Sequence, residues 1–482
     1  MPLRPTLVAL AAAVLLSACA AGPDYVRPTL PVPAAYKESG VWKTADPRAA
    51  VSGLAWWQAY GDPALNALMA DADNANQNIR QAEATYRQAK AIVDEDRAGL
   101  FPTLGLNLGA ERARTNTNGV LHTGNSYSLG LAGSWEPDLW GSVRRTIESG
   151  VASAQASADD LAAARLSIQT TPAQDYVQLR IADQQRDLYA ATVDAYAKAL
   201  KLTQAQHNAG VALQSDVSLA EAQLAQAQAA AIDLDATRAQ LEHAIAVLTG
   251  RAPAQFTLAA TPANQPLALQ MPDTPAGLPS ELLEHRPDIA GAERRAAAAN
   301  ANIGVAKAAY FPQLTLSASG GFGAAALSNL FDAPARVWSL GAALAETIFD
   351  GGLRTARVAQ ALAAYDITVA QYKETVLGGF QQVEDELALL RLLSQEVTFQ
   401  DQAVRSSLQA EQSAIAQYRA GTLSYLSVVT TQSTLLNNQR TAVQLRGRLM
   451  AASISLVSAT GGGWSASDPL AAAPAASAAQ PL

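Results

Sequence analysis

The chain has 482 residues, four histidines and one cysteine, and its formal net charge is −8. The acidic balance excludes the basic surface by which proteins bind nucleic acid, and one cysteine excludes intrachain disulfides and a thiolate metal cluster. Because no two histidines lie at the spacing of metal ligands, we expect neither a metal site nor another cofactor.

Residues 1–18 have the pattern of a signal peptide. A weakly basic start precedes an apolar stretch over residues 6–16, and Leu16-Ser17-Ala18-Cys19 follows it. This pattern is typical of bacterial lipoproteins, in which the cysteine is lipidated and begins the mature protein. An ordinary signal peptide that contains a cysteine is the alternative. We expect Cys19 to be lipidated, and Ala20 in place of an aspartate implies retention in the outer membrane.

Residues 19–60 are rich in proline and tryptophan and predict an extended segment that lies on the body of the protein. After Cys19 no uncharged apolar run reaches 18 residues, so we expect no membrane-spanning helix. Asp62 and Pro63 fit the N-cap and first position of a helix, which we predict to continue to about Ala98.

Two stretches then alternate between apolar and small polar residues with period two. We predict β-hairpins over 101–135 and 311–346, the first with a polar loop from Glu111 to Asn125. Strands of about ten residues match a tilted bilayer crossing, and aromatic residues near their ends match an interfacial girdle. A half-buried hairpin on a soluble domain is the alternative.

The number of strands predicts an oligomer. Four strands per chain cannot close a barrel, because single-chain barrels begin at about eight strands. Two chains would supply eight strands, whose side chains largely fill the interior, whereas three chains would supply twelve strands and leave a lumen. The sequence therefore favours a trimer.

A pair of long helices is predicted after each hairpin. Each first helix has roughly 60 residues and would measure about 90 Å, and such lengths without internal caps suggest coiled-coil packing. The first of the four predicted helices ends near Gln206. The other three span Ser215–Leu248, Leu353–Gln417 and Ser424 to about Thr460. Pro172 lies inside the first of them and removes a hydrogen bond, so we predict a bend or a 3₁₀ turn over 170–172.

The chain repeats itself at a nearly constant offset. Ser-Leu-Gly at 128–130 returns at 339–341, and Thr-Gly at 249–250 returns at 460–461, both 211 residues later. We predict an internal two-fold repeat in an α+β, mainly α fold. The predicted parts are repeat 1 over 61–250, a linker over 251–278, repeat 2 over 279–464 and a disordered tail over 465–482.

Several motifs together resemble the TolC-like outer membrane efflux lipoproteins of the NodT type. They are Trp56-Trp57-Gln58-Ala59-Tyr60-Gly61-Asp62-Pro63, His285-Arg286-Pro287-Asp288-Ile289, Ala309-Tyr310-Phe311-Pro312, Ile348-Phe349-Asp350-Gly351-Gly352 and Ala459-Thr460-Gly461-Gly462-Gly463-Trp464. The resemblance implies a homotrimer with a 12-strand transmembrane β-barrel, continuous with a long periplasmic α-helical barrel that has an equatorial domain at its waist.

The resemblance also implies the function. Such proteins are outer-membrane exit ducts that passively conduct small molecules, and their partners are a periplasmic adaptor and an inner-membrane resistance–nodulation–division transporter. An outer-membrane channel for type I protein secretion and a periplasmic coiled-coil adaptor are the alternatives. We expect no enzyme activity. Arg286-Pro287-Asp288 could be misread as an active-site motif, but Asp288 with Glu293, Arg294 and Arg295 predicts only a helix start with surface charges.

The resemblance places a periplasmic gate at the two interhelical turns. Asp216 matches the family's acidic position, although capping of the following helix is the alternative. Tyr418 matches the family's tyrosine, while Gln417 and Thr430 stand where relatives often have arginine and aspartate. We therefore expect neutral hydrogen bonds and a weakly latched gate.

The same turns are the expected adaptor contact. The residues of this contact are Gly210, Val211, Gly421, Thr422, Leu423 and Ser424. The alternative for the two glycines is that they only end helices.

Overall fold

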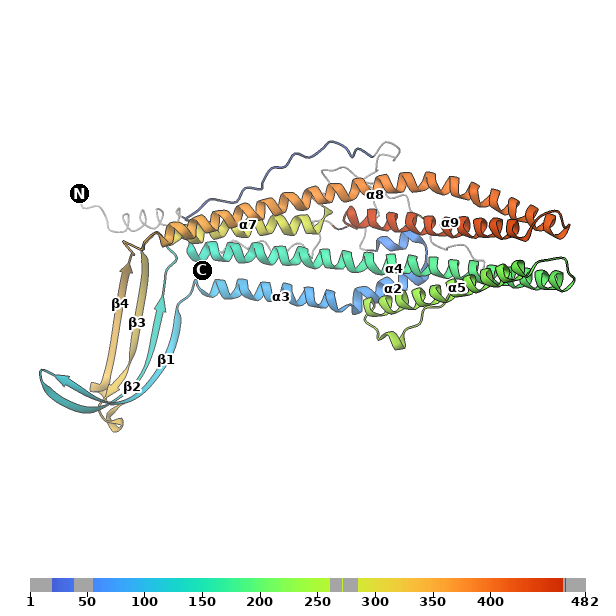
Figure 1. The fold of residues 1–482 in the computed structure, drawn as a ribbon. Coiled ribbons are helices and arrows are strands. Elements are labelled where there is room, and N and C mark those ends of the chain that lie inside the picture. The colour runs from blue at the N-terminus through green and yellow to red at the C-terminus, as the bar shows by residue number, and fades with distance from the viewer. Residues whose placement is uncertain (1–19, 39–54, 261–270, 272–284, 463, 465–482) are drawn as a thin grey trace. The chain divides into compact units, whose positions relative to one another are not determined.

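The fold is mainly helical with one small antiparallel sheet, as the computed structural model shows (Figure 1). The structure describes residues 20–38, 55–260, 271, 285–462 and 464, so the signal peptide, Cys19 and the predicted tail lie outside the described residues. The chain divides into two units. The first contains 85–157, 291–373 and the described residues before Pro31, and the second contains the other described residues.

The sheet of the first unit has the strand order β1-β2-β3-β4, and all neighbours are antiparallel. The strands are β1 (Thr103–Thr117), β2 (Val120–Trp135), β3 (Gln313–Ala324) and β4 (Arg336–Ala345). The register places Leu106 opposite Leu131, and Leu131 opposite Gly320. The predicted apolar positions of the four strands therefore share one face.

The predicted loop from Glu111 to Asn125 is wrong, because β1 and β2 remain paired until Thr117 and Val120. The turn is formed by Asn118 and Gly119 alone, with φ angles of 53° and 84°. Two positive φ angles match the right-handed twist of a two-residue hairpin, and Asn-Gly is the strongest short sequence signal for it. The polar side chains along this stretch concealed that signal.

Long helical hairpins follow the strands. Their helices are α4 (Ser142–Asn208) with α5 (Gln214–Leu248), and α8 (Leu353–Arg419) with α9 (Tyr425–Ala459). Both α4 and α8 have 67 residues, and both α5 and α9 have 35 residues. Among the described residues, no helix is both long enough and apolar enough to cross a membrane.

The core of the second unit gathers around a short 3₁₀ helix, η1 (Trp56–Tyr60), and α2 (Pro63–Ala75). Asp62 is the N-cap of α2, and its carboxylate accepts from the N–H groups of Ala64 and Leu65 at 2.8 and 3.4 Å, which confirms the predicted helix start. Large buried side chains of this core include Trp56, Tyr60, Leu65, Met69, Tyr176 and Ile245.

One predicted helix is two helices. Instead of one helix to Ala98, the structure has α2 and α3 (Gln77–Ala98), separated by Asn76 in an extended conformation. The Asn76 side chain accepts from the N–H groups of Asn78 and Ile79 at 2.8 and 3.3 Å. It therefore caps α3, which offsets the hydrogen bonds lost at the break.

Of the bend or 3₁₀ turn predicted over 170–172, the 3₁₀ turn is wrong, since α4 is α-helical without interruption there, while the bend stays a prediction. A proline inside a helix costs about 3 kcal/mol. The cost is offset by packing directly after it, where Ala173, Tyr176 and Val177 are at most 1% exposed in the core.

The ends of α5 and α9 form two matching joints. The Asn76 amide donates to the carbonyl of Leu248, the last residue of α5, at 2.8 Å. The Arg286 guanidinium donates to the carbonyl of Ala459, the last residue of α9, at 3.1 Å. Both side chains therefore satisfy a carbonyl that the helix end leaves without a partner.

A glycine lies against the neighbouring backbone at each joint. Gly250 has a φ of +70°, and a Cβ atom there would lie 2.5 Å from the Ala75 carbonyl oxygen. Gly461 has a φ of +95°, and a Cβ atom there would lie 1.8 Å from the His285 carbonyl oxygen. The joints explain why Thr-Gly occurs twice in the sequence.

Arg286, next to the predicted helix start, is a buried arginine. It lies just before α7 (Pro287–Ala308), so the predicted helix start is correct, and only 8% of Arg286 is exposed. The predicted surface position of Glu293 is wrong, because only 5% of it is exposed. Arg286 donates to the Asp288 carboxylate at 2.6 Å and to the Gln382 side chain at 2.7 Å, besides its bond at the joint. A buried guanidinium with several acceptors is a structural element rather than a solvated charge.

Candidate functional site

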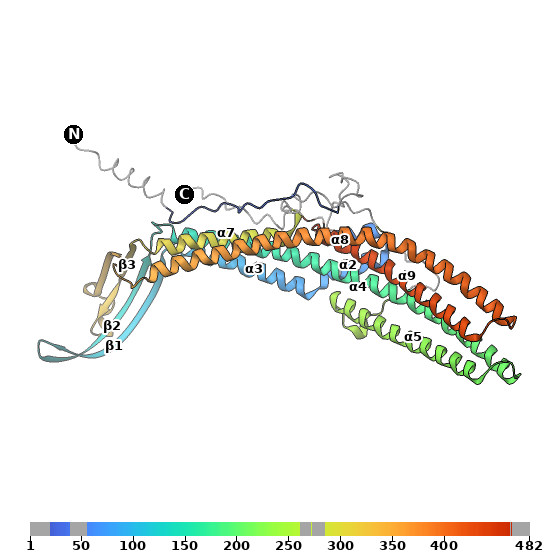
Figure 2. The same ribbon diagram turned by 45° about the horizontal axis from the view of Figure 1, so that its top comes forward.

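The two helical hairpins end in the same turn. In both views α4 lies beside α5 and α8 beside α9 up to these turns (Figures 1 and 2). Gly210 and Gly421 have φ angles of 76° and 75°, a region that favours glycine. The N–H of Val211 donates to the Gln206 carbonyl at 2.9 Å, and the N–H of Thr422 donates to the Gln417 carbonyl at 3.0 Å. Both glycines therefore end their helices as C-caps.

A small core holds the four helix ends together beside the turns. Ala220 of α5, Ala414 of α8, and Tyr425 and Val428 of α9 are buried in it. Leu423, one of the expected adaptor contacts, packs against this core and is only half-exposed. The other expected contacts are exposed, namely Gly210, Val211, Gly421, Thr422 and Ser424.

Asp216 is half-buried in the first turn of α5. Its carboxylate accepts from the Leu213 N–H at 3.2 Å, and its own N–H donates to the Leu213 carbonyl at 3.1 Å. This is the reciprocal geometry of a capping box, with a backbone carbonyl in place of the usual side chain. These two hydrogen bonds support the interpretation that Asp216 caps α5. The carboxylate also adds a negative charge beside the turn.

Tyr418 joins the two hairpins. Its hydroxyl donates to the side-chain oxygen of Gln206 on α4, and its ring centre lies 5.3 Å from that of Tyr425. Tyr425 is 3% exposed, and this burial raises the pKa of its hydroxyl, which also bonds to Thr203. The two tyrosines thus tie α8 and α9 to α4 through neutral groups.

Gln417 and Thr430 form local bonds. The Gln417 carbonyl accepts from the Thr422 hydroxyl at 3.1 Å, and the Thr430 hydroxyl donates to the Leu426 carbonyl at 2.9 Å. Within the described residues, the hydrogen bonds do not link Gln417, Tyr418 and Thr430 to one another. The side chains that the structure does link to Tyr418 are those of Gln206 and Tyr425.

Sequence reasoning missed Gln206 and Tyr425. Gln206 lies 211 residues before Gln417, so the repeat offset was a signal that could have indicated it. Tyr425 had no comparable signal, because its matching position in the first repeat is Gln214. Among the described residues, no cluster of three or more histidine, cysteine, aspartate or glutamate side chains is arranged to hold a metal ion.

The residues directly after Cys19 are fixed within the first unit. The Ala21 N–H donates to the carbonyl of Trp140 at 3.0 Å, and Arg145 of α4 donates to the Ala21 carbonyl at 3.1 Å. Arg145 also pairs with Asp24 at 2.9 Å. Because Trp140 follows β2 closely, the described chain begins beside the end of the sheet at which β2 ends, which we call the foot of the sheet.

Gly22 and Trp140 tighten this attachment. A Cβ atom on Gly22, whose φ is +98°, would lie 2.4 Å from the Cα atom of Gly304 on α7, so only glycine fits there. The Trp140 ring stacks on Phe311 at 4.8 Å and donates to the Pro312 carbonyl at 2.6 Å. Two aromatic residues therefore lie in contact where β2 ends and β3 begins.

The comparisons with known proteins agree on one family. The family described as Outer membrane efflux protein matches residues 68–251 and 278–462. Pyoverdine export outer membrane protein OpmQ of Pseudomonas aeruginosa is 32% identical over 466 residues, which cover 94% of this chain and 96% of that protein. Outer membrane protein OprJ of the same organism is 32% identical over 463 residues, which cover 95% of this chain and 95% of that protein.

A solved structure gives the same result. The outer-membrane channel OprN superimposes with a TM-score of 0.86 at 30% sequence identity. The match covers 92% of this chain and 100% of that chain.

Proposed function

The chain belongs to the outer membrane efflux protein family, and from this premise we propose that it is the outer-membrane exit duct of a tripartite efflux pump. The duct conducts small molecules passively from the periplasm to the exterior, while its partners supply the energy. The family consists of efflux channels and is not a family of enzymes.

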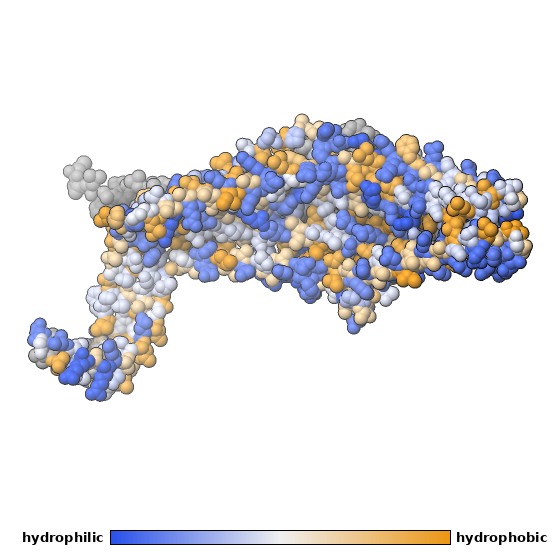
Figure 3. All heavy atoms as spheres, viewed as in Figure 1, coloured by the Kyte–Doolittle hydropathy of each residue, from blue (hydrophilic) through white to orange (hydrophobic). Residues whose placement is uncertain are grey.

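The observation that carries the proposal is the apolar face of the sheet. Leu104, Leu106 and Leu108 of β1 and Leu340 and Leu344 of β4 are 69 to 78% exposed. Such a face is unfavourable in water but matches the hydrocarbon region of a bilayer. Residues 111–126, the far part of the β1–β2 hairpin, are mostly polar, and the end of the sheet in Figure 3 is coloured mainly hydrophilic, as expected for a segment that leaves the lipid.

The sheet also supports a trimer. Within the described chain β1 and β4 each pair with one strand, and an edge strand in lipid needs a partner for its N–H and C=O groups. Three copies of four strands would form a closed barrel of twelve strands with a lumen. The helical hairpins of three copies would continue it as a periplasmic α-helical barrel.

An internal duplication supports this arrangement. The matching helices of the two hairpins begin 211 residues apart, and the two segments that match the family begin 210 residues apart. Two similar hairpins per chain would give three copies six similar sectors around one axis. The proposed repeats are 61–250 and 279–464, joined by the linker over 251–278.

Lipidation of Cys19 fits the attachment of the residues that follow it. Ala20 lies next to Gly141, where an added Cβ atom would be 3.1 Å from the Ala20 Cα atom. The acyl chains on Cys19 would therefore begin at the foot of the sheet, at the periplasmic surface of the outer membrane. Mass spectrometry of the mature protein tests this, and an unmodified Cys19 contradicts it.

The gate at the helical turns is weakly latched in this proposal. Tyr418 bonds to a neutral glutamine, and each neutral hydrogen bond contributes only about 0.5–1.5 kcal/mol. Asp216 would add one negative charge per chain, and three copies would form an acidic ring. The double variant Gln417→Arg and Thr430→Asp is expected to lower spontaneous opening of single channels, and unchanged opening contradicts the weak latch.

The adaptor and an inner-membrane resistance–nodulation–division transporter are the proposed partners. The exposed residues Val211, Thr422 and Ser424 at the turns are the proposed adaptor contact, with Leu423 supporting it from the core. Val211 is 77% exposed, so its side chain is accessible to a partner.

Conductance across a planar lipid bilayer tests the duct. The purified full-length protein should insert and form pores, and Leu106→Asp should reduce insertion strongly, because a charge on the lipid face costs up to a few kcal/mol. Asn107→Asp is the matched control on the opposite face of the same strand and should insert normally. Normal insertion of Leu106→Asp would contradict the proposed lipid face.

Export by cells separates small-molecule efflux from protein secretion. A host that lacks this chain should accumulate a fluorescent dye and lose it again when the chain is restored. Unchanged dye together with a trapped polypeptide would favour the secretion alternative.

A further inference from the structure

A cavity of about 610 Å³ lies among α4, α5 and α9 in the second unit. Its volume is within the range of about 300–1,000 Å³ typical of small-molecule sites. Its apolar wall includes Val177, Ile181, Leu234 and Leu241. At one edge α9 approaches α4 so closely that a Cβ atom on Gly447 would lie 2.7 Å from the Ile181 side chain.

Two arginines of α9 give this cavity a positive character. Arg440 and Arg448 line it together with Gln444, whereas Asp233 of α5 is its one acidic lining residue among those described. The Arg440 guanidinium carbon lies 5.9 Å from the centre of the Tyr189 ring, which is itself 6% exposed. The cavity therefore combines an apolar wall, an aromatic ring and an excess of cationic groups.

Arg440 has a hydrogen-bond donor without a partner. Its Nε atom is buried and, among the described residues, no acceptor bonds to it. A buried donor without an acceptor costs about 1–3 kcal/mol. An anionic ligand would satisfy this donor with a charge-assisted bond, and the planar guanidinium suits a carboxylate or sulfonate.

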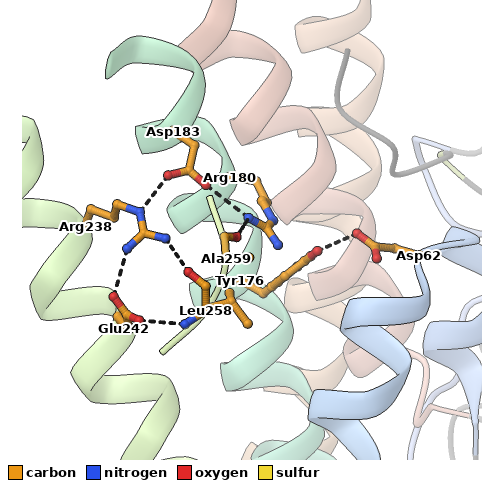
Figure 4. Close-up of polar contacts among 8 residues, drawn as sticks. All are labelled: Asp62, Tyr176, Arg180, Asp183, Arg238, Glu242, Leu258 and Ala259. Carbon is orange, nitrogen blue, oxygen red and sulfur yellow. Dashed lines mark hydrogen bonds and ion pairs between the residues drawn. The ribbon is translucent and has the colours of Figure 1, made fainter. Parts of the chain in front are cut away.

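The walls of the cavity are held in place by a polar cluster (Figure 4). Arg238 of α5 donates to Asp183 of α4 at 2.7 Å, and Arg180 pairs with the same carboxylate at 3.0 Å. Asp183 and Arg238 stand next to Ala182 and Thr237, which line the cavity. The ion pairs fix α4 against α5 without a ligand.

The segment after α5 completes the cluster. Arg238 donates to the Leu258 carbonyl at 2.6 Å, and the Leu258 N–H donates to Glu242 at 2.6 Å. Arg180 donates to the Ala259 carbonyl at 2.8 Å (Figure 4). A site whose walls are fixed in advance loses less entropy on binding.

We propose that this cavity binds a small amphiphilic organic anion, with its carboxylate or sulfonate at Arg440 and its apolar body against Ile181 and Leu234. Tyr189 contributes an aromatic surface, and Arg448 attracts the anion from the exposed side. The proposal concerns a binding site in the helical wall and does not depend on whether the ligand is exported.

Ligand-observed fluorine NMR on the full-length protein in a nonionic detergent tests this. The probes are trifluoromethylbenzenesulfonate and its cationic twin, trifluoromethylbenzylammonium, with empty micelles as the blank. We expect saturable broadening for the sulfonate only. Arg440→Gln should weaken its binding about tenfold or more, because the charge-assisted bond is lost.

Arg446→Gln is the matched control. It removes the same charge from the same helix, but Arg446 pairs with Asp401 at 2.8 Å and does not line the cavity. Ala451→Leu fills the cavity without changing charge and should also abolish binding, which keeps the test decisive if Arg440→Gln does not fold.

Three results would overturn the proposal. They are equal binding of the benzylammonium, an equal loss in Arg446→Gln and Arg440→Gln, and unaltered binding in Ala451→Leu. None of them involves conductance or export, so the proposed duct function stands or fails separately.

Discussion

The hairpins α4–α5 and α8–α9 have similar backbone geometry but different side chains at matched positions. Their helices have equal lengths, their turns have glycines with nearly equal φ angles, and their far ends have the same type of joint. At matched positions the side chains differ: Asn76 and Arg286 at the joints, and His207 and Tyr418 beside the turns. The comparison indicates that the two hairpins keep the same helix lengths, turns and joints, while different side chains form the contacts at matched positions in each hairpin.

Substitutions at the two joints should destabilise the protein most, and the loss should be larger at the joint after α9 than at the joint after α5. Gly461→Ala places a Cβ atom 1.8 Å from the His285 carbonyl oxygen at a φ of +95°. We expect a loss of about 3 kcal/mol or more in the free energy of unfolding, enough to reduce folded protein strongly. Thermal unfolding of the purified protein, followed by circular dichroism, measures the loss.

The matched variant is Gly250→Ala, where the corresponding distance is 2.5 Å and φ is +70°. We expect a smaller loss of about 2 kcal/mol. Equal losses would show that the two joints are equally constrained, and reversed losses would show that the first joint is the more constrained one.

The polar side chains of the joints should follow the same order. Arg286→Ala removes the donors to Asp288, Gln382 and the Ala459 carbonyl, and we expect a loss of about 3 kcal/mol. Asn76→Ala removes one carbonyl partner and the cap of α3, so we expect about 2 kcal/mol. Chemical denaturation of both variants side by side measures the difference, and a larger loss in Asn76→Ala would contradict it.

Pro172 is a difference between the hairpins that substitution can remove. Its matching position in α8 is Val383, which is fully buried. Pro172→Val restores an N–H inside an unbroken helix, which favours the folded state. Replacing proline also raises the conformational entropy of the unfolded chain, which favours unfolding. We therefore expect a net gain of about 1–2 kcal/mol in the free energy of unfolding. A higher midpoint in thermal unfolding is the expected result, and Val383→Ala controls for a change of side-chain packing alone. A lower midpoint would mean that the proline ring itself packs better than valine.

Local signals predicted much of the fold. Asp62 and Pro63 indicated the start of α2, and Thr249-Gly250 indicated the end of α5, because caps and left-handed glycines act within one turn of helix. Period-two alternation predicted the faces of the strands, which the register confirms.

The remaining features depend on residues distant in sequence. The break at Asn76 is stabilised by Leu248, and the partner of Tyr418 is Gln206 on another helix. A glutamine carries no charge that would indicate such a contact, and only its offset of 211 residues from Gln417 could have pointed to it. The unbroken helix at Pro172 likewise depends on the surrounding core, which outweighs local propensity.

The smallest effect separates two roles of Asp216. Asp216→Ala removes the acceptor for the Leu213 N–H, and we expect a loss of about 1 kcal/mol, whereas Asp216→Asn keeps an acceptor oxygen and should cost less. At the matching position of the second turn, Ser427 places its hydroxyl 3.2 Å from that of Ser424, so that turn needs no carboxylate. If three copies of Asp216 form the proposed acidic ring, both variants lower the cation selectivity of the channel equally, although alanine destabilises the protein more than asparagine does. Single-channel reversal potentials in a salt gradient measure that selectivity. Wild-type selectivity in Asp216→Asn would leave the carboxylate with capping alone, and the two hairpins would then differ at their turns in stability rather than in gating.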